Sequence, residues 1–203
     1  MPNWKTHLEL AKKVNNYLQY DDLSFNIFLF GSILPDINNS FVVTSIKEKI
    51  SHSITHFKDE NNKTYVNFGN KYKKEIDSRN PLFLGYFFHL YLDYSFNNYF
   101  YTKKRNNLNI EEHNKVREIK QHDFKLFNNN FISNQIKIDD IDKLLQEIKN
   151  IKEISITKED IFEVINFLNK QEFYNGEYKV FTPDELNCLF DSAVKNTLDW
   201  LKK

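Results

Sequence analysis

The sequence predicts an all-α, multi-helix bundle, and three observations lead to this fold class. Four glycines and four prolines in 203 residues are too few to supply the turns of a β-sandwich or barrel. No segment sustains a two-residue alternation, whereas apolar residues recur at three- and four-residue steps. The chain is 40% hydrophobic and 16% aromatic, which is enough to fill a sizeable core and excludes a disordered protein.

The elements of the first half follow from apolar spacing and from capping residues. A helical stripe covers residues 4–18. Asp21 or Asp22 then caps a second helix, which runs to about residue 34 because Pro35 stops it. A loop is expected over residues 36–44. Further helices are predicted over residues 46–57, 65–76 and 81–99, the last of them strongly aromatic.

The second half continues the helical pattern after a polar connector at residues 102–109. Thr182, Pro183 and Glu185 form a strong start signal, with a threonine cap, proline at the first position and glutamate three residues after the cap. The total is about eight or nine helices. We expect a helical core over residues 1–134 and C-terminal helices packed on it over residues 135–203. Helices are predicted over residues 110–131 and 136–154, after residue 157, and from residue 182 to residue 201.

Charge and cysteine content exclude several classes of protein. Twenty-eight basic residues balance 28 acidic ones, so net charge gives no signal for nucleic-acid binding. A single cysteine, Cys188, excludes an internal disulfide and a cysteine-based zinc cluster. No apolar stretch reaches the roughly 20 residues of a transmembrane helix, and no signal peptide is recognisable. We therefore expect a cytoplasmic protein without a transmembrane segment, of undetermined oligomeric state.

The strongest candidate for chemistry is a His–Asp pair on the aromatic helix. His89 and Asp93 are four residues apart, which places their side chains on one helix face about 6 Å apart. One imidazole and one carboxylate so placed can bind the same cation. A hydrogen-bonded pair that satisfies itself in the core explains the same spacing. Spacing alone leaves both interpretations open.

Four other residues are weaker candidates when taken singly. His52 and His56 are also four residues apart, but the lysines around them favour a solvated pair. Asp36, at the end of an apolar helix, either caps the next turn or presents a carboxylate at a functional site. His7 by itself fits a partly buried histidine with no special role.

An adjacent His–Asp pair provides a different enzyme hypothesis. His122 and Asp123 follow one another on a predicted helix, with His89 upstream and Asp139 or Asp140 downstream. The His-Asp dyad class of metal phosphohydrolases is also all-α and uses such a pair. The spacings are generic, so this hypothesis stands as an alternative.

Four stretches occur in a specific order: WKTH at residues 4–7, FGSILPDI at 30–37, HFKD at 56–59 and LGYFFHLYLD at 84–93. This ordered set resembles the bacterial zinc-dependent phospholipase C family, including its phospholipase C/D-type domains. The likeness covers residues 4–93 and continues more weakly to about residue 131. It implies a multi-helix bundle of the type shared with single-strand-specific zinc nucleases.

The resemblance also implies the site and its chemistry. Asp36, His56, His89 and Asp93 would form one zinc site, and His7 would contribute to a neighbouring one bridged by Asp93. Imidazole and carboxylate are both ligands of zinc, which makes its bound water nucleophilic near neutral pH. The implied activity is a zinc-dependent, phospholipase C-like phosphodiester hydrolase. Metal-activated water would attack phosphorus, and Asp36 would help to take the proton.

The chain departs from the family pattern at the remaining ligands. Trp4 has no cleavage signal before it, so it is not expected to supply terminal metal ligands. His113 and His122 lack a glutamate four positions later, and Glu118 and Asp123 are the candidate substitutes. We therefore expect one or two zinc ions rather than three, and a phosphodiester or phospholipid-like small substrate. A non-catalytic helical binding or scaffold protein with a degraded metal site is the main alternative.

Overall fold

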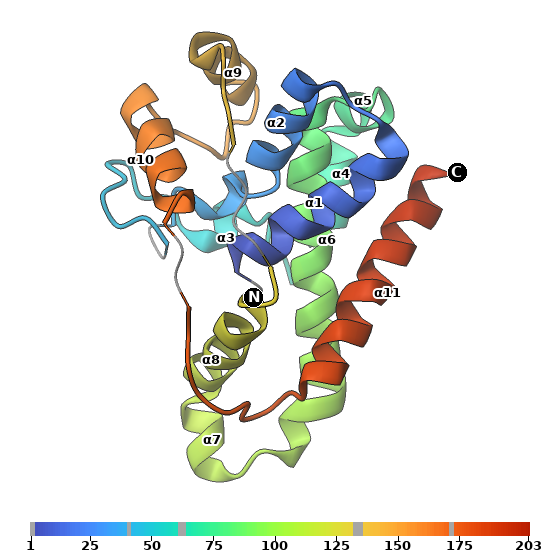
Figure 1. Cartoon of the computed structure of the whole chain (residues 1–203), viewed down its shortest axis with the longest axis vertical. Coiled ribbons are helices and arrows are strands. Elements are labelled where there is room, and N and C mark those ends of the chain that lie inside the picture. The colour runs from blue at the N-terminus through green and yellow to red at the C-terminus, as the bar shows by residue number, and fades with distance from the viewer. Residues whose placement is uncertain (1–2, 40–41, 61–63, 132–135, 171–172) are drawn as a thin grey trace.

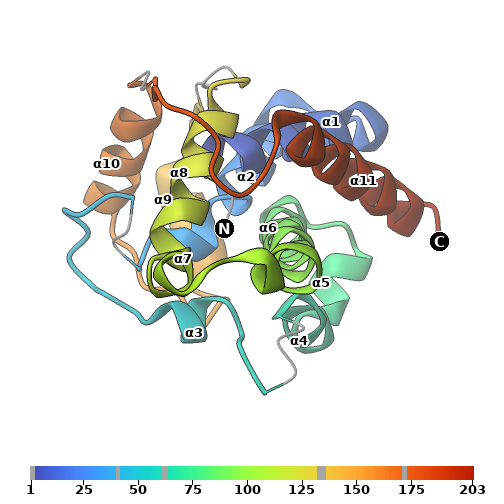
Figure 2. The same ribbon diagram turned by 90° about the horizontal axis from the view of Figure 1, so that it is seen from below.

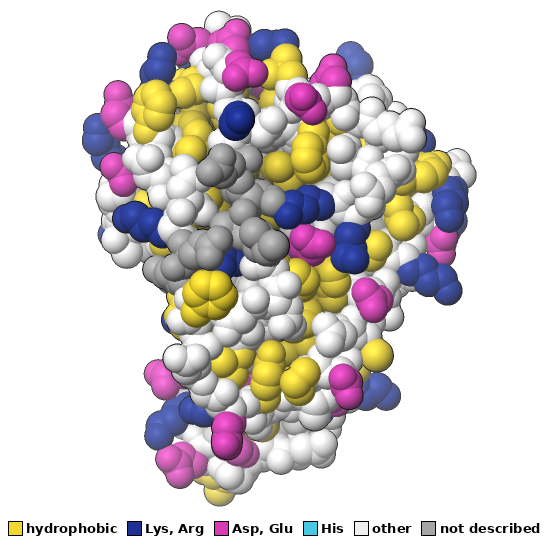
Figure 3. Space-filling view, viewed as in Figure 1, with side chains coloured by type: hydrophobic (Ala, Val, Ile, Leu, Met, Phe, Trp, Pro, Cys, Tyr) yellow, Lys and Arg dark blue, Asp and Glu magenta, His cyan; other side chains and the backbone are white. Residues whose placement is uncertain are grey.

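The computed structural model describes residues 3–39, 42–60, 64–131, 136–170 and 173–203. Within these ranges every regular element is a helix and there is no strand, which confirms the all-α prediction. On the face shown in Figure 3, acidic and basic side chains are interspersed and neither forms a large patch. That distribution agrees with the zero net charge of the chain.

The aromatic helix α6 (Pro81–Tyr99) forms the centre of the fold, as Figures 1 and 2 show. It begins where the sequence predicts, with the Asn80 side chain accepting the backbone N–H groups of Leu82 and Phe83. Most of its residues are buried, as expected for a helix that is apolar all round. Even so, none of the described helices combines the length and apolarity needed to cross a bilayer. The helices that pack on α6 are α1 (Trp4–Leu18), α2 (Asp22–Gly31), α4 (Thr64–Lys71), α5 (Lys73–Asp77) and α11 (Pro183–Leu201).

Helices α2 and α6 are in close backbone contact because a glycine stands on each. A Cβ atom on Gly31 would lie 2.3 Å from the carbonyl oxygen of Leu82. One on Gly85 would lie 2.4 Å from the carbonyl oxygen of Phe28. Any larger residue would force the two helices apart. The close approach sets the end of α2 beside the first turns of α6, one turn before His89, whose ring reaches the carbonyl oxygen of Ser32.

Short elements complete the chain. The turn η1 (Leu34–Asp36) follows α2, and Asn38 fixes the segment after it. The Asn38 side chain donates to the carbonyl oxygens of Glu48 (2.8 Å) and Ser155 (2.5 Å). The remaining elements are α3 (His52–Thr55), η2 (Phe100–Lys104), η3 (Arg105–Asn107), α7 (Ile110–Asn114), α8 (Val116–Asn128), α9 (Ile141–Ile148) and α10 (Lys158–Leu168).

Several predicted helices are shorter than expected. The helix predicted over 46–57 is reduced to α3, because Asn38 binds the backbone of Glu48 and Ile50 in place of helical partners. The one predicted over 65–76 breaks at Tyr72, whose hydroxyl donates to Glu153 at 2.8 Å. That over 110–131 breaks at Lys115, which leaves helical geometry. The helix predicted over residues 136–154 is reduced to α9, and α2 ends at residue 31 rather than at about residue 34. The segment predicted as a connector over residues 102–109 lies largely in η2 and η3.

The C-terminal helix α11 lies against the N-terminal half of the chain. It contacts α1 and α6, and Arg79 donates to the carbonyl oxygen of Leu201 at 2.9 Å. Its start confirms the predicted capping box between Thr182 and Glu185, with Pro183 in the first turn. The division of the chain at residue 134 stays a prediction.

Candidate metal centre

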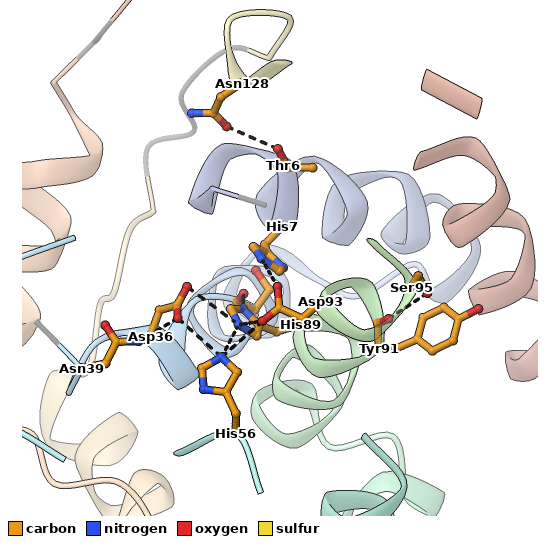
Figure 4. Close-up of polar contacts among 11 residues, drawn as sticks. Thr6, His7, Asp36, Asn39, His56, His89, Tyr91, Asp93, Ser95 and Asn128 are labelled. Atoms are coloured by element: carbon orange, nitrogen blue, oxygen red, sulfur yellow. Dashed lines mark hydrogen bonds and ion pairs between the residues drawn. The ribbon is translucent and has the colours of Figure 1, made fainter. Parts of the chain in front are cut away.

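Five side chains converge in the interior, as Figure 4 shows, and we call them the candidate centre. His7 comes from α1, Asp36 from η1, His56 from the end of α3, and His89 and Asp93 from α6. Each residue is 5% exposed or less. Four separate elements thus place titratable groups in one buried location. The five are His7, Asp36, His56, His89 and Asp93.

One half of the centre has the spacing of ligands around a single ion. Nε2 of His56 lies 3.3 Å from Oδ2 of Asp93 and 3.3 Å from Nε2 of His89. The same nitrogen is 3.5 Å from Oδ1 of Asp36, and Nε2 of His89 is 3.6 Å from Oδ2 of Asp93. Ligands bound tetrahedrally at zinc distances lie about 3.3–3.6 Å apart. His56, His89 and Asp93 form one group of potential ligands, and Asp36 adjoins it, with its Oδ2 3.9 Å from Nε2 of His89.

His7 approaches the other side of the Asp93 carboxylate. Its Nε2 lies 3.4 Å from Oδ1 of Asp93, whereas His56 and His89 face Oδ2. Its ring stacks on that of His89, with centroids 3.9 Å apart. Asp93 thus stands between two adjacent ligand positions.

Hydrogen bonds from neighbouring groups orient the ligands. Nδ1 of His89 lies 2.8 Å from the carbonyl oxygen of Ser32, which can only accept, so Nδ1 carries the proton. The unprotonated Nε2 then faces the centre, as in metal-binding histidines. Thr55 Oγ1 lies 3.0 Å from Nδ1 of His56, and Asn39 donates to Oδ1 of Asp36 at 2.9 Å. These hydrogen bonds hold His89, His56 and Asp36 in place before any ion is bound.

The fit to a metal ion is shown by atoms that lack partners. Within the described part of the chain, both ring nitrogens of His7 and both carboxylate oxygens of Asp93 are buried without a hydrogen bond. Burying such groups unpaired is costly, and native interiors rarely do so. A cation between them satisfies the oxygens of Asp93 and Nε2 of His7 together. The donor set of nitrogen and oxygen is one that zinc accepts.

The electrostatics of the centre favour ionised carboxylates and a neutral His7, whereas Asp93 and Asp36, against the effect of burial, raise the pKa of His89. Burial raises the pKa of Asp93, but His89, His56 and His7 outweigh it and hold this pKa well below the usual range. Burial also raises the pKa of Asp36, but His89 and His56 outweigh burial and lower this pKa below its usual value. Burial and then His89 lower the pKa of His7 to about 4, so this imidazole is neutral at physiological pH. Metal ligation requires ionised carboxylates and neutral imidazoles.

A family model described as zinc dependent phospholipase C matches residues 6–173, which include the whole candidate centre. The chain belongs to the zinc-dependent phospholipase C family. No curated protein and no solved structure is significantly similar to it. The family is zinc-dependent, and the buried His/Asp groups of this chain are of a kind that could hold a metal ion.

The second metal site predicted for this family member is not assembled. His113 and Glu118 are exposed, and Nε2 of His122 donates to the carbonyl oxygen of Glu177 at 3.0 Å. Among the described residues, none of the groups of three potential ligands includes these side chains or Asp123. Asp123 is fully buried and accepts three backbone N–H groups at 2.8–2.9 Å, from Lys179, Val180 and Phe181. Its carboxylate holds a chain segment in place, which is a structural role.

His52 lies against His56, although the sequence favoured a solvated pair. Its ring stacks on His56 with centroids 3.6 Å apart, and Asp36, His52 and His56 form a further group of possible ligands. His56 is 1% exposed, so the expectation that both histidines are solvated was wrong. The neighbouring lysines suggested solvent, but His56, at the end of the single turn α3, is buried and His52 is partly exposed. The four-residue spacing was the available signal.

Proposed function

We propose that this chain is a zinc-dependent phosphodiester hydrolase of the phospholipase C type, acting on a phosphodiester or phospholipid-like small substrate. The observation that supports the proposal is the candidate centre itself, with two carboxylates, three imidazoles and unpartnered buried atoms within ligand distance. Such a set has no evident structural purpose, because it places costly polar groups in the core. The family assignment gives the centre its chemistry.

The residues divide into two ligand sets. Asp36, His56 and His89 would hold one zinc ion together with Oδ2 of Asp93, and His7 would hold a second beside Oδ1 of Asp93. Zinc supplies Lewis acidity toward the phosphodiester and makes water nucleophilic near neutral pH. The carbonyl of Ser32 keeps the proton of His89 on Nδ1. One or two ions is the stoichiometry that these side chains support.

Asp36 is the residue we assign to proton transfer. It is the most exposed member of the centre, at 5%, and its lowered pKa keeps it ionised at neutral pH. Asn39 holds one oxygen, Oδ1, at 2.9 Å. The other oxygen, Oδ2, is the atom we propose to accept the proton of the attacking water.

The test begins with metal content and continues with activity. Protein purified without chelator should contain at least one equivalent of zinc, measured by mass spectrometry of the metal. It should hydrolyse bis(p-nitrophenyl) phosphate or p-nitrophenyl phosphorylcholine, and His89→Ala should abolish both zinc retention and hydrolysis. His113→Ala, which removes an exposed histidine on α7, should change neither.

Two results would contradict the proposal. Less than about half an equivalent of zinc at neutral pH would favour the helical scaffold with a degraded site. Full zinc occupancy without hydrolysis of either ester would leave a metal-binding protein that is not an enzyme of this class.

A further inference from the structure

Lys120, on α8, is a buried lysine that forms no ion pair with a carboxylate in the part of the chain that the structure describes. It is 8% exposed, and its Nζ donates to Oδ1 of Asn97 at 3.1 Å. The same nitrogen lies 4.4 Å from the centroid of the Phe100 ring and 5.2 Å from that of Tyr101. One hydrogen bond and two aromatic rings are the polar and ring contacts of its ammonium among the described residues. An ammonium in such a place is unusual, because burying a cation without an anionic partner is costly.

The position of Lys120 connects it to the candidate centre. His89, Asp93 and Asn97 follow one another at four-residue steps on α6, so they share one helix face. Each step advances about 6 Å along the axis. Asn97, whose Oδ1 accepts from the ammonium, therefore stands one helical turn beyond Asp93 on the face that carries the ligands. Burial lowers the pKa of Lys120 to about 8, and the charge of Asp93 acts in the opposite direction.

The ammonium also has unused donor capacity. A lysine carries three N–H donors, and Asn97 takes one of them. Within the described residues no carboxylate lies within 4.0 Å of this nitrogen. A second cation, Lys58, is close enough that its charge lowers the pKa of both Lys120 and His52. The ammonium groups of Lys120 and Lys58 therefore add positive charge beside a centre whose side chains are suited to bind metal cations. An anionic ligand placed between these ammonium groups and a bound metal ion would be attracted by both.

We propose that Lys120 binds a non-bridging phosphate oxygen of the substrate at the candidate centre. The proposal rests on the proposed function, and it adds a named substrate-binding residue to it. A phosphodiester carries one negative charge over two non-bridging oxygens, so one oxygen can face the metal ligands and the other can accept from Lys120. A lysine acts there as a point charge with a directional donor. Its aromatic surroundings exclude water, which strengthens the interaction.

The experiment compares phosphate binding in matched lysine variants of the zinc-loaded protein. Lys120→Met should weaken binding of inorganic phosphate about tenfold or more at pH 7 by calorimetry, with zinc content unchanged. For bis(p-nitrophenyl) phosphate it should raise KM more than it lowers kcat. Lys120→Arg should retain part of the affinity. The control is Lys125→Met on the same helix, where an exposed lysine lies 5.1 Å from the Tyr174 ring, and it should bind phosphate like the unmodified protein.

The outcomes separate this inference from the proposed function. Phosphate affinity that is equal in Lys120→Met and the unmodified protein would overturn it, as would an unmodified zinc-loaded protein that binds no phosphate. Phosphate binding that depends on Lys120 in a protein without hydrolytic activity would uphold the inference while removing the proposed function. Should Lys120→Met fail to fold, Lys120→Gln provides the same loss of charge.

Discussion

His7 and Asp93 face each other across the candidate centre, with 3.4 Å between Nε2 of the imidazole and Oδ1 of the carboxylate. The other carboxylate oxygen, Oδ2, faces His56 at 3.3 Å and His89 at 3.6 Å. The two oxygens of one side chain are therefore directed at different histidines. A carboxylate in this position can bridge two metal ions, and that arrangement has a measurable consequence.

We predict that His7→Ala binds about one zinc ion fewer than the unmodified protein, whereas Asp93→Ala binds less than about one in total. His7 serves one ligand position only, and Asp93 serves both. Zinc stoichiometry after equilibrium dialysis gives the answer, with His113→Ala as the control for loss of an exposed histidine. Equal zinc content in His7→Ala and the unmodified protein would show that His7 holds no ion.

The sequence predicted the local half of this site. His89 and Asp93 lie on one helix, so helical geometry alone places them on one face. His7, Asp36 and His56 come from three other elements, and no local rule brings those together. They were predicted through the resemblance, whose ordered motifs carry tertiary information. His52 was undervalued, because its stacking on the buried His56 depends on a turn that α3 makes only in the folded chain.

Helix starts were predicted better than helix lengths, for a related reason. Caps such as Asn80 and Thr182 act on the next few residues, so the sequence contains both partners. The helix predicted over residues 46–57 fails because Asn38 binds the backbone of Glu48 and Ile50. That interaction joins distant parts of the loop and competes with helical hydrogen bonds, which periodicity does not reveal.

Zinc affinity should fall as the pH drops from 8 to 5. Burial lowers the pKa of His89, but the charges of Asp93 and Asp36 outweigh burial and raise this pKa in the metal-free protein. A proton therefore competes with zinc at a higher pH than it would at an ordinary histidine. Below that raised pKa, affinity should fall about tenfold per pH unit for each proton displaced. The pKa of His7, lowered to about 4 by burial and His89, adds no proton in this range.

Competition titrations with a chromophoric chelator measure this dependence. His113→Ala should give the same slope as the unmodified protein, because its histidine is exposed and belongs to none of the groups of possible ligands among the described residues. Zinc retention that is undiminished well below about pH 6.5 would contradict histidine ligation.

Asp123→Ala should destabilise the fold without removing zinc. The buried carboxylate accepts three backbone N–H groups, so its loss leaves buried donors unpaired and should cost about 3 kcal/mol or more. Urea unfolding gives this value, and metal analysis at low temperature gives zinc content. Asp142→Ala removes an exposed carboxylate 3.5 Å from Lys158 and should change stability by less than about 1 kcal/mol. Loss of zinc with unchanged stability would instead support a His-Asp dyad enzyme.

Gly85→Ala should weaken both stability and zinc binding, since it acts on the contact between α2 and α6. The new methyl group would lie 2.4 Å from the carbonyl oxygen of Phe28 and 2.8 Å from the backbone nitrogen of Ser32. Backbone atoms cannot move aside as a side chain can, so α6 must shift, at a cost of about 1–3 kcal/mol. The shift also disturbs the 2.8 Å hydrogen bond from His89 to the carbonyl of Ser32, which orients the ligand.

Gly69→Ala, on α4, is the matched control for that substitution. Its methyl group would lie 3.1 Å from the edge of the Phe87 ring, a side chain that can rotate slightly. Alanine is also favoured over glycine in a helix by up to about 1 kcal/mol, so stability should change little. Thermal unfolding gives the stability of both variants, and competition titrations with a chelator give their zinc affinity. If Gly85→Ala were as stable as Gly69→Ala and bound zinc equally well, the close helix contact would not be what positions His89.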